Sequence, residues 1–331
     1  MPSLRLGGCL DAPLHGARPD EPARVGRDRR LPRRDDPQAP RRPVRRVLLL
    51  GGVPRDARAQ RRAGRAVSGA PPVRVGLIGL GAIGRGVVRL AREGHPGAIM
   101  FVGALVRDPA RPRSAGGPTI VGSIDGLLAE RPEVVVEAAS HEALRAHGAA
   151  VLRAGIDLLA LSVGALADPA LVDALSGAAR DGGARVRVLS GAIAGLDAIR
   201  GAAVGGIERV THTTRKPAST LLPANEAAAL SAPREIYRGA ARAGVLRFPE
   251  SANVAAAVSL AGIGFDRTEL RVVADPSIER NRHEVVVEGS FGRLEIRIEN
   301  VPTEENPRTG RIVAMSVVRA LLDRRAEIVI G

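Results

Sequence analysis

A glycine-rich turn, GLGAIG at residues 79–84, constrains the fold more than any other feature of this sequence. It follows the apolar run Val73–Ile78, which predicts a fully buried strand. After the turn, Ile83–Arg92 has the apolar spacing of an amphipathic helix. A strand, a GxGxxG turn and a helix in this order are typical of a dinucleotide-binding unit.

Each position of the turn has a physical reason. Gly79 permits the tight turn, Gly81 lets a pyrophosphate approach the backbone, and Gly84 lets helix and strand pack closely. Ala82 and Ile83 begin the helix, whose N-terminus offers N–H donors and a positive dipole end to the phosphates. We therefore predict cofactor contacts at all five residues.

Beyond the turn, apolar strands alternate with helices. The further predicted strands are Ala98–Val106, Val134–Glu137, Asp157–Leu161 and Ala184–Leu189. The helices are Ile124–Leu128, Ser140–Ala154 with Ser140 as N-cap, and Pro169–Asp181. This alternation implies right-handed crossovers, so the predicted class is α/β with a Rossmann doubly wound parallel sheet.

After Leu196 the apolar period changes to two, which indicates a second α+β domain with a mostly antiparallel sheet. The alternating segments are Glu208–Thr214, Leu270–Ala274, His283–Glu288 and Arg293–Glu299. We predict that Thr268–Val273, Glu284–Gly289 and Leu294–Asn300 form a meander with a hairpin turn at Gly289–Gly292. A last helix, Thr309–Leu322, is expected to pack back on the nucleotide domain. The predicted domains are 73–192, completed by 303–331, for the dinucleotide, and 193–302 for substrate and catalysis, to which the family resemblance described below adds dimerisation.

The net charge of +14 is unevenly placed, because residues 1–72 alone hold 17 Arg and 7 acidic residues. This Arg- and Pro-rich leader predicts a disordered tail or a start site assigned too far upstream; a targeting or nucleic-acid arm is the alternative. The remaining chain is nearly balanced, and no nucleic-acid binding is expected of it. Cys9 is the only cysteine, which fits a reducing cytoplasm and leaves no thiolate metal site. No apolar run is long enough for a membrane span.

Ligands of open parallel sheets bind beyond the carboxyl ends of the strands. The second strand ends in Arg107 and Asp108, and an acid there favours NAD whereas an arginine favours NADP, so either cofactor is expected. Three small polar loops follow later strands, and a nicotinamide ring could lie close to their backbone. They are Ala138–His141, which contains Ser140 and His141, Ser162–Ala165, and Ser190–Ala192.

Several stretches together resemble the L-aspartate dehydrogenase family from residue 73 to about 330. They are GLIGLGAIGRGV, EAASHEAL, LSVGALAD, SGAIAGLDAI, TRKP, FPESANVAAAVSLAG, ADPSIERNRHEV and ENPRTGRIVAMSV. The resemblance implies oxidative deamination of L-aspartate to oxaloacetate and ammonia through iminoaspartate by a homodimer using NAD or NADP. It also implies a place in NAD biosynthesis, with iminoaspartate passed to quinolinate synthase.

By position, the resemblance places the catalytic histidine at His283 and NAD contacts at Ala192 and Asn253. Ala194 stands where the family usually has glycine, and its methyl could crowd the turn. Asn253 could instead be only a helix cap.

The residues themselves suggest how such chemistry could proceed. The reaction removes a hydride from a carbon that bears an amine, and water then attacks the imine. Both steps need a group that titrates near neutrality to transfer protons, and histidine suits both. His141, at a strand end, is the second candidate after His283. Two substrate carboxylates need cations or aimed donors, so Arg215, Lys216 (the only lysine) and Ser162 are candidate substrate ligands.

Two other functions are compatible with this architecture. One is a related reductase such as a homoserine dehydrogenase; a dihydrodipicolinate reductase is disfavoured, because its lysine- and histidine-rich signature is missing. The other is a regulator that binds NAD(H) without turnover, against which the NRH motif at residues 281–283 argues.

Overall fold

The computed structural model describes residues 70–110, 117–249, 252–306 and 309–330. All of them belong to one unit of the chain, 56–331. The predicted leader, with Cys9, lies outside these residues except for its last three positions. In the ranges described, no helix combines the length and apolarity that a membrane crossing requires.

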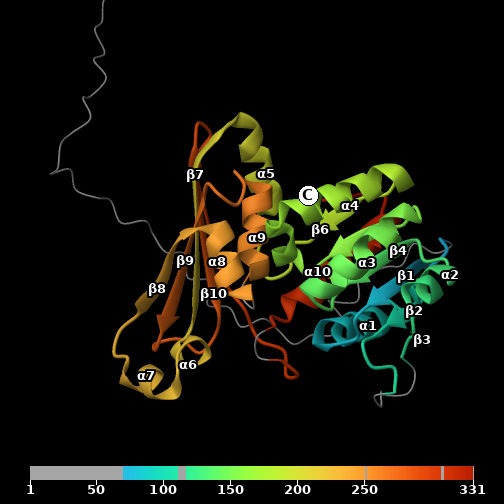
Figure 1. Cartoon of the computed structure of the whole chain (residues 1–331), viewed down its shortest axis with the longest axis horizontal. Helices are drawn as coiled ribbons and strands as arrows, with labels where there is room; N and C mark the ends of the chain where they lie inside the picture. The colour runs from blue at the N-terminus through green and yellow to red at the C-terminus, as the bar shows by residue number, and fades with distance from the viewer. Residues whose placement is uncertain (1–69, 111–116, 250–251, 307–308, 331) are drawn as a thin grey trace, which may run out of the picture. The chain divides into compact units, whose positions relative to one another are not determined.

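The first sheet has six parallel strands in the order β3-β2-β1-β4-β5-β6 (Figure 1). Its strands are β1 (Val73–Ile78), β2 (Ile99–Leu105), β3 (Ile120–Val121), β4 (Val134–Glu137), β5 (Asp157–Ala160) and β6 (Val186–Val188). The chain winds outward from β1 in one direction and then from β4 in the other, so a crevice opens where the order reverses. The predicted doubly wound sheet is confirmed.

Helices connect these strands. They are α1 (Ala82–Gly94), α2 (Ile124–Ala129), α3 (His141–Arg153), the 3-10 turn η2 (Val163–Ala167) and α4 (Pro169–Gly182). Ser140 caps α3 as predicted, because its hydroxyl accepts from the Ala143 N–H at 3.2 Å. Strands β1 and β4 were predicted to the residue, whereas β3 was missed because two residues carry no periodicity.

The second sheet has five strands in the order β11-β10-β7-β9-β8. They are β7 (Ile207–Pro217), β8 (Arg234–Ala240), β9 (Thr268–Asp275), β10 (Arg282–Gly289) and β11 (Gly292–Glu299). Only β7 and β9 pair in parallel, so the sheet is mostly antiparallel, as predicted.

The predicted meander is wrong in one respect. The β10–β11 hairpin exists, with Gly289 opposite Gly292. However, β9 does not pair with β10, because β7 lies between them and pairs with both. An alternating pattern predicts which face of a strand is buried but does not predict the neighbouring strand.

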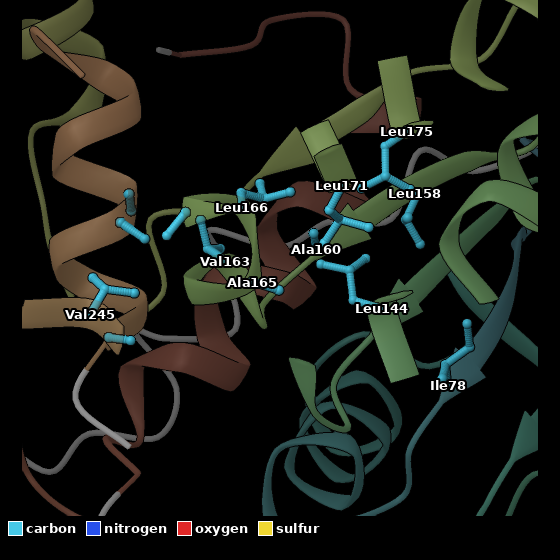
Figure 2. Close-up of a cluster of buried hydrophobic side chains, with 14 of the residues drawn as sticks. Ile78, Leu144, Leu158, Ala160, Val163, Ala165, Leu166, Leu171, Leu175 and Val245 are labelled. Atoms are coloured by element: carbon cyan, nitrogen blue, oxygen red, sulfur yellow. The ribbon is translucent and has the colours of Figure 1, made fainter. Parts of the chain in front are cut away.

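A helix buried nearly all round, α9 (Ala252–Ala261), joins the two sheets. Ala255 and its neighbours belong to a core cluster with the parallel sheet and η2, whereas Val254 and Val258 pack with β7 and β10. Figure 2 shows the first cluster running from Ile78 through Val163 toward Val245 of α8 (Ala241–Arg247). The remaining helices near the second sheet are α5 (Leu196–Gly205), α6 (Ala218–Leu221) and α7 (Ala224–Ala229).

The last helix, α10 (Ile312–Leu322), packs against the first sheet and α1 and is followed by the 3-10 turn η4 (Asp323–Arg325). Val313, Val317 and Leu321 are buried in one cluster with residues of β1 and α1. The predicted packing of this helix against the first sheet is therefore seen, although the helix starts three residues later than predicted.

Candidate active site

A cavity of about 900 Å³ opens at the carboxyl ends of β1, β2 and β4. Its wall contains Gly79 and Gly81 from the glycine turn, Arg107 and Asp108 after β2, and Ser140 after β4. These five predicted cofactor residues come from three separate loops, and the parallel sheet brings them together. An arginine and an aspartate both line this cavity. Its wall is therefore compatible with the ribose 2′-hydroxyl of NAD and with the 2′-phosphate of NADP.

The glycine turn has the shape that a pyrophosphate needs. A methyl group added at Gly81 would meet no atom within 4 Å, so space is open beside the first N–H groups of α1. At Gly84 an added methyl carbon would lie 2.5 Å from the Gly79 carbonyl oxygen. Gly79 itself has φ +95°, in the left-handed region that favours glycine. The turn therefore packs tightly against the protein at Gly79 and Gly84 and leaves free space for a ligand beside Gly81.

Glu137, the last residue of β4, ties the neighbouring loops together and is fully buried. Its Oε1 accepts from the N–H groups of Ala139 at 2.8 Å and Ser140 at 3.1 Å. Ser162 donates twice, from its hydroxyl to Oε1 at 2.9 Å and from its N–H to Oε2 at 3.0 Å. Burial raises the pKa of Glu137, and the four hydrogen bonds oppose that rise.

This arrangement places the predicted substrate ligand Ser162 away from both cavities, because its hydroxyl is directed at Glu137. Glu137 was not predicted as a site residue, although the sequence carries a signal for it. A carboxylate that ends an otherwise apolar parallel strand must find donors nearby.

A second cavity, of about 120 Å³, brings together predicted residues from both sheets. Ile83 of α1, Ala192 after β6, Asn253 of α9, Lys216 of β7 and His283 of β10 all line it. Its other polar residues are Ser190, Asn281 and Thr309. Five distant chain segments thus converge on a space suited to a small polar molecule.

The strand register explains why the cationic and imidazole groups of this cavity meet. His212, Thr214 and Lys216 alternate on one buried face of β7, and His283 of β10 lies opposite Thr214. Burial, and secondly the charge of Lys216, lowers the pKa of His283 from its ordinary 6.5 to about 4. His283 is therefore a neutral imidazole at neutral pH, and because the ring is buried its pKa lies below the near-neutral range predicted from the sequence.

Asn253 connects the second cavity with two strand-end loops. Its Oδ1 accepts from the Gly164 N–H at 2.9 Å and lies 3.2 Å from His141 Nε2. Since this oxygen bonds to η2 rather than to the N–H groups of its own helix, the cap interpretation is wrong. Asn253 also lines the second cavity. His141 supports Asn253 but lines neither cavity.

Arg215 points to the opposite face of β7 from Lys216. Its guanidinium lies 3.8 Å from Asp275 and 3.5 Å from Glu284, and it lines neither cavity. Ala194 also lies outside both cavities and is exposed, so the expected crowding by its methyl does not reach them.

Two residues near the second cavity were not predicted. His212 is fully buried with its Nε2 3.3 Å from His283 Nδ1. Asn300 is also buried and donates from Nδ2 to the Ala192 carbonyl at 3.0 Å. Both depend on pairings between distant segments, which a single sequence does not reveal. Within the described ranges, no three His, Cys, Asp or Glu side chains are grouped to hold a metal ion.

Comparison with known proteins identifies the class to which this fold belongs. Residues 79–189 match the family model for the homoserine dehydrogenase NAD-binding domain. The structure resembles the crystal structure of aspartate dehydrogenase from Thermotoga maritima, with a TM-score of 0.65 and 26% identity over 78% of this chain and 99% of that one. The protein is therefore a nicotinamide-dependent dehydrogenase.

The second half of the chain shows which family of dehydrogenases the protein belongs to. Residues 197–324 match the model for the aspartate dehydrogenase C-terminal domain. The chain is 42% identical over 264 residues to an L-aspartate dehydrogenase of Ruegeria pomeroyi, covering 77% of this chain and 94% of that one. It is 41% identical over 261 residues to one of Ralstonia nicotianae, covering 76% and 97%. The chain belongs to the L-aspartate dehydrogenase family.

Proposed function

We propose that this protein oxidises L-aspartate to iminoaspartate, which water converts to oxaloacetate and ammonia, with NAD or NADP as the cofactor. The observation that carries the proposal is the second cavity, where a neutral imidazole, a buried ammonium and an amide face one small space. Family membership supplies the substrate, because the relatives are named for aspartate.

The glycine turn would hold the pyrophosphate on the N–H groups of α1, as its open and closed positions fit. Arg107, Asp108 and Ser140 would contact the adenosine half. Asn253, supported by His141, and Ala192 would border the nicotinamide half. When bound, the nicotinamide supplies the acceptor for the hydride of the substrate.

In the second cavity, the Lys216 ammonium would pair with a substrate carboxylate. The His283 imidazole would accept a proton from the substrate amine, so that the nitrogen lone pair can form the imine. It would release that proton to solvent, later accept one from the water that attacks the imine carbon, and return this second proton to the nitrogen as it leaves as ammonia. Arg215 and Ser162 are not assigned to the substrate, because neither lines this cavity.

The wider organisation is also a proposal. Residues 73–192 with 303–331 would bind the dinucleotide, and 193–302 would bind substrate and form a homodimer. We place the enzyme in the cytoplasm, where its iminoaspartate could pass to quinolinate synthase for NAD biosynthesis.

The test is an assay of the purified protein with L-aspartate, L-glutamate, L-alanine and L-homoserine, each with NAD and with NADP. Formation of reduced nicotinamide should be at least about tenfold more efficient, as kcat/KM, with aspartate than with the others. Preference for homoserine would favour the related reductase. Binding of NADH without turnover of any substrate would favour the regulator.

A further inference from the structure

The geometry points to a positioning role for His212. We propose that Nε2 of His212 accepts the Nδ1–H hydrogen bond of His283 and so keeps the lone pair of His283 Nε2 directed at the second cavity. This inference rests on the proposed function, because it assumes that His283 accepts a proton during turnover.

The sheet brings the two rings together without bringing His212 to the substrate. His212 lies opposite Val285 in the β7–β10 register, so it is the diagonal neighbour of His283 on the same face. The two facing nitrogens are 3.3 Å apart, and the ring planes are tilted by 31° with centroids 5.4 Å apart. His283 lines the cavity, whereas His212 is wholly buried behind it.

The positions of the hydrogens determine what His283 can do. A neutral imidazole carries one N–H, and one hydrogen must lie between the facing nitrogens. If His212 donated it, the hydrogen of His283 would lie on Nε2, which could then accept no proton. If His283 donates from Nδ1, its Nε2 faces the cavity as an acceptor.

Proton uptake leaves only the second arrangement. An imidazolium carries hydrogens on both nitrogens, so a protonated His283 must donate from Nδ1, and His212 must accept. The neutral state that already has this arrangement needs no tautomer change before proton transfer. His212 then carries its own hydrogen on Nδ1, where no acceptor lies among the described residues, so the preference for this arrangement comes from proton uptake by His283 and not from the surroundings of His212.

The chemical nature of the partner also has a consequence. Burial, and secondly His283, lowers the pKa of His212 well below its ordinary value, so His212 is an uncharged acceptor. A carboxylate in its place would attract a proton to His283. An imidazole orients the ring and leaves it unprotonated beside the Lys216 ammonium.

Nuclear magnetic resonance can read the tautomer directly. Protein labelled with ¹⁵N-histidine is recorded at pH 7 in long-range ¹⁵N–¹H spectra, and His283 is assigned by comparison with His283→Ala. We expect the hydrogen of His283 on Nδ1 and an unprotonated Nε2. A hydrogen on Nε2 would overturn the proposal.

Kinetics of two variants provide the second test. His212→Leu removes the acceptor, and we expect kcat with aspartate to fall by about 10- to 100-fold, as when a partner that orients an active histidine is lost. KM and the Kd for NADH should change by no more than about threefold, because His212 touches neither ligand. His212→Gln, whose carbonyl oxygen can accept from Nδ1–H, should recover most of kcat. Ser259→Ala, which removes a buried hydroxyl that has no hydrogen-bond partner among the described residues, is the control and should retain full activity.

These outcomes separate the inference from the proposed function. Unchanged kcat in a folded Leu variant, or equal loss in the Leu and Gln variants, would overturn the role of His212. If the Leu variant does not fold, the wild-type spectrum still decides the tautomer. If wild-type protein shows no aspartate turnover, the proposed function fails, and the spectrum still reports which ring donates.

Discussion

The first and second cavities of the candidate site are built in different ways. The first cavity, in which we propose that the cofactor binds, is built around a glycine turn, a helix N-terminus and loops that Glu137 holds together. The second cavity is formed by side chains from distant segments, chiefly His283, Lys216 and Asn253. We expect added methyl groups in the glycine turn to impair cofactor binding. In the second cavity, we expect removal of a functional side chain to impair turnover or substrate binding.

The sharpest test of this difference is His283→Ala. Loss of a general acid–base group should lower kcat by about 10²- to 10⁴-fold. The Kd for NADH should stay within about twofold, because the glycine turn is untouched. Steady-state kinetics and a fluorescence titration with NADH measure the two quantities. A parallel loss of NADH binding would show that the cavities are not separable.

The same imidazole should make the fold sensitive to acid. The pKa of His283 is lowered from 6.5 to about 4, so between these values the unfolded chain binds a proton that the folded chain does not. The contribution of His283 to the free energy of unfolding is therefore fully present above pH 6.5. It falls by about 3 kcal/mol as the pH drops to 4.

Urea unfolding of wild type and His283→Ala at pH 7 and pH 4.5 measures this effect. The variant should lose less stability than wild type over that interval. Equal losses would mean that His283 is not buried as a neutral ring.

The neighbours Lys216 and Arg215 allow a test within one strand. Lys216→Ala removes a buried cation and should raise KM for aspartate by about 30- to 100-fold, equivalent to a charge-assisted bond of about 2–3 kcal/mol. Arg215→Ala removes a half-exposed ion-pair partner on the other face, and its KM should remain within about threefold. Similar KM changes in both variants would place the substrate elsewhere.

Two alanines in the glycine turn test the first cavity. At Gly84 the added methyl meets a backbone oxygen, so Gly84→Ala should lower the free energy of unfolding by about 1–3 kcal/mol. At Gly81 it meets no protein atom, so the free energy of unfolding should fall by no more than about 1 kcal/mol, the cost of an alanine in place of a glycine N-cap. NADH affinity should nevertheless fall about tenfold for Gly81→Ala, because the methyl enters the ligand's space. Thermal unfolding without ligand and NADH titration distinguish the two; unaltered NADH affinity in Gly81→Ala would place the pyrophosphate elsewhere.

The same difference explains what the sequence could predict. The strand, turn and helix around residues 73–94 are local, and periodicity with glycine spacing predicted them. The pairing of His212 with His283 depends on β7 entering the sheet between β9 and β10, and alternation carries no information on that choice. Strand β8 was missed because its partly exposed residues do not alternate. Ser162 was predicted as a substrate ligand. Its hydrogen bond to Glu137 joins two residues that are distant in the sequence, so the sequence alone did not reveal that its hydroxyl is already engaged.

The position of α10 has a consequence for biosynthesis. Ribosomes release a chain from its amino end, yet the apolar side chains of β1 and α1 are covered by Val313, Val317 and Leu321. A nascent chain that has already exposed the whole glycine turn still lacks this cover. The first sheet therefore starts to form early but gains its full apolar cover only when α10 has been synthesised. Premature termination near residue 310 should leave a product prone to aggregation and degradation.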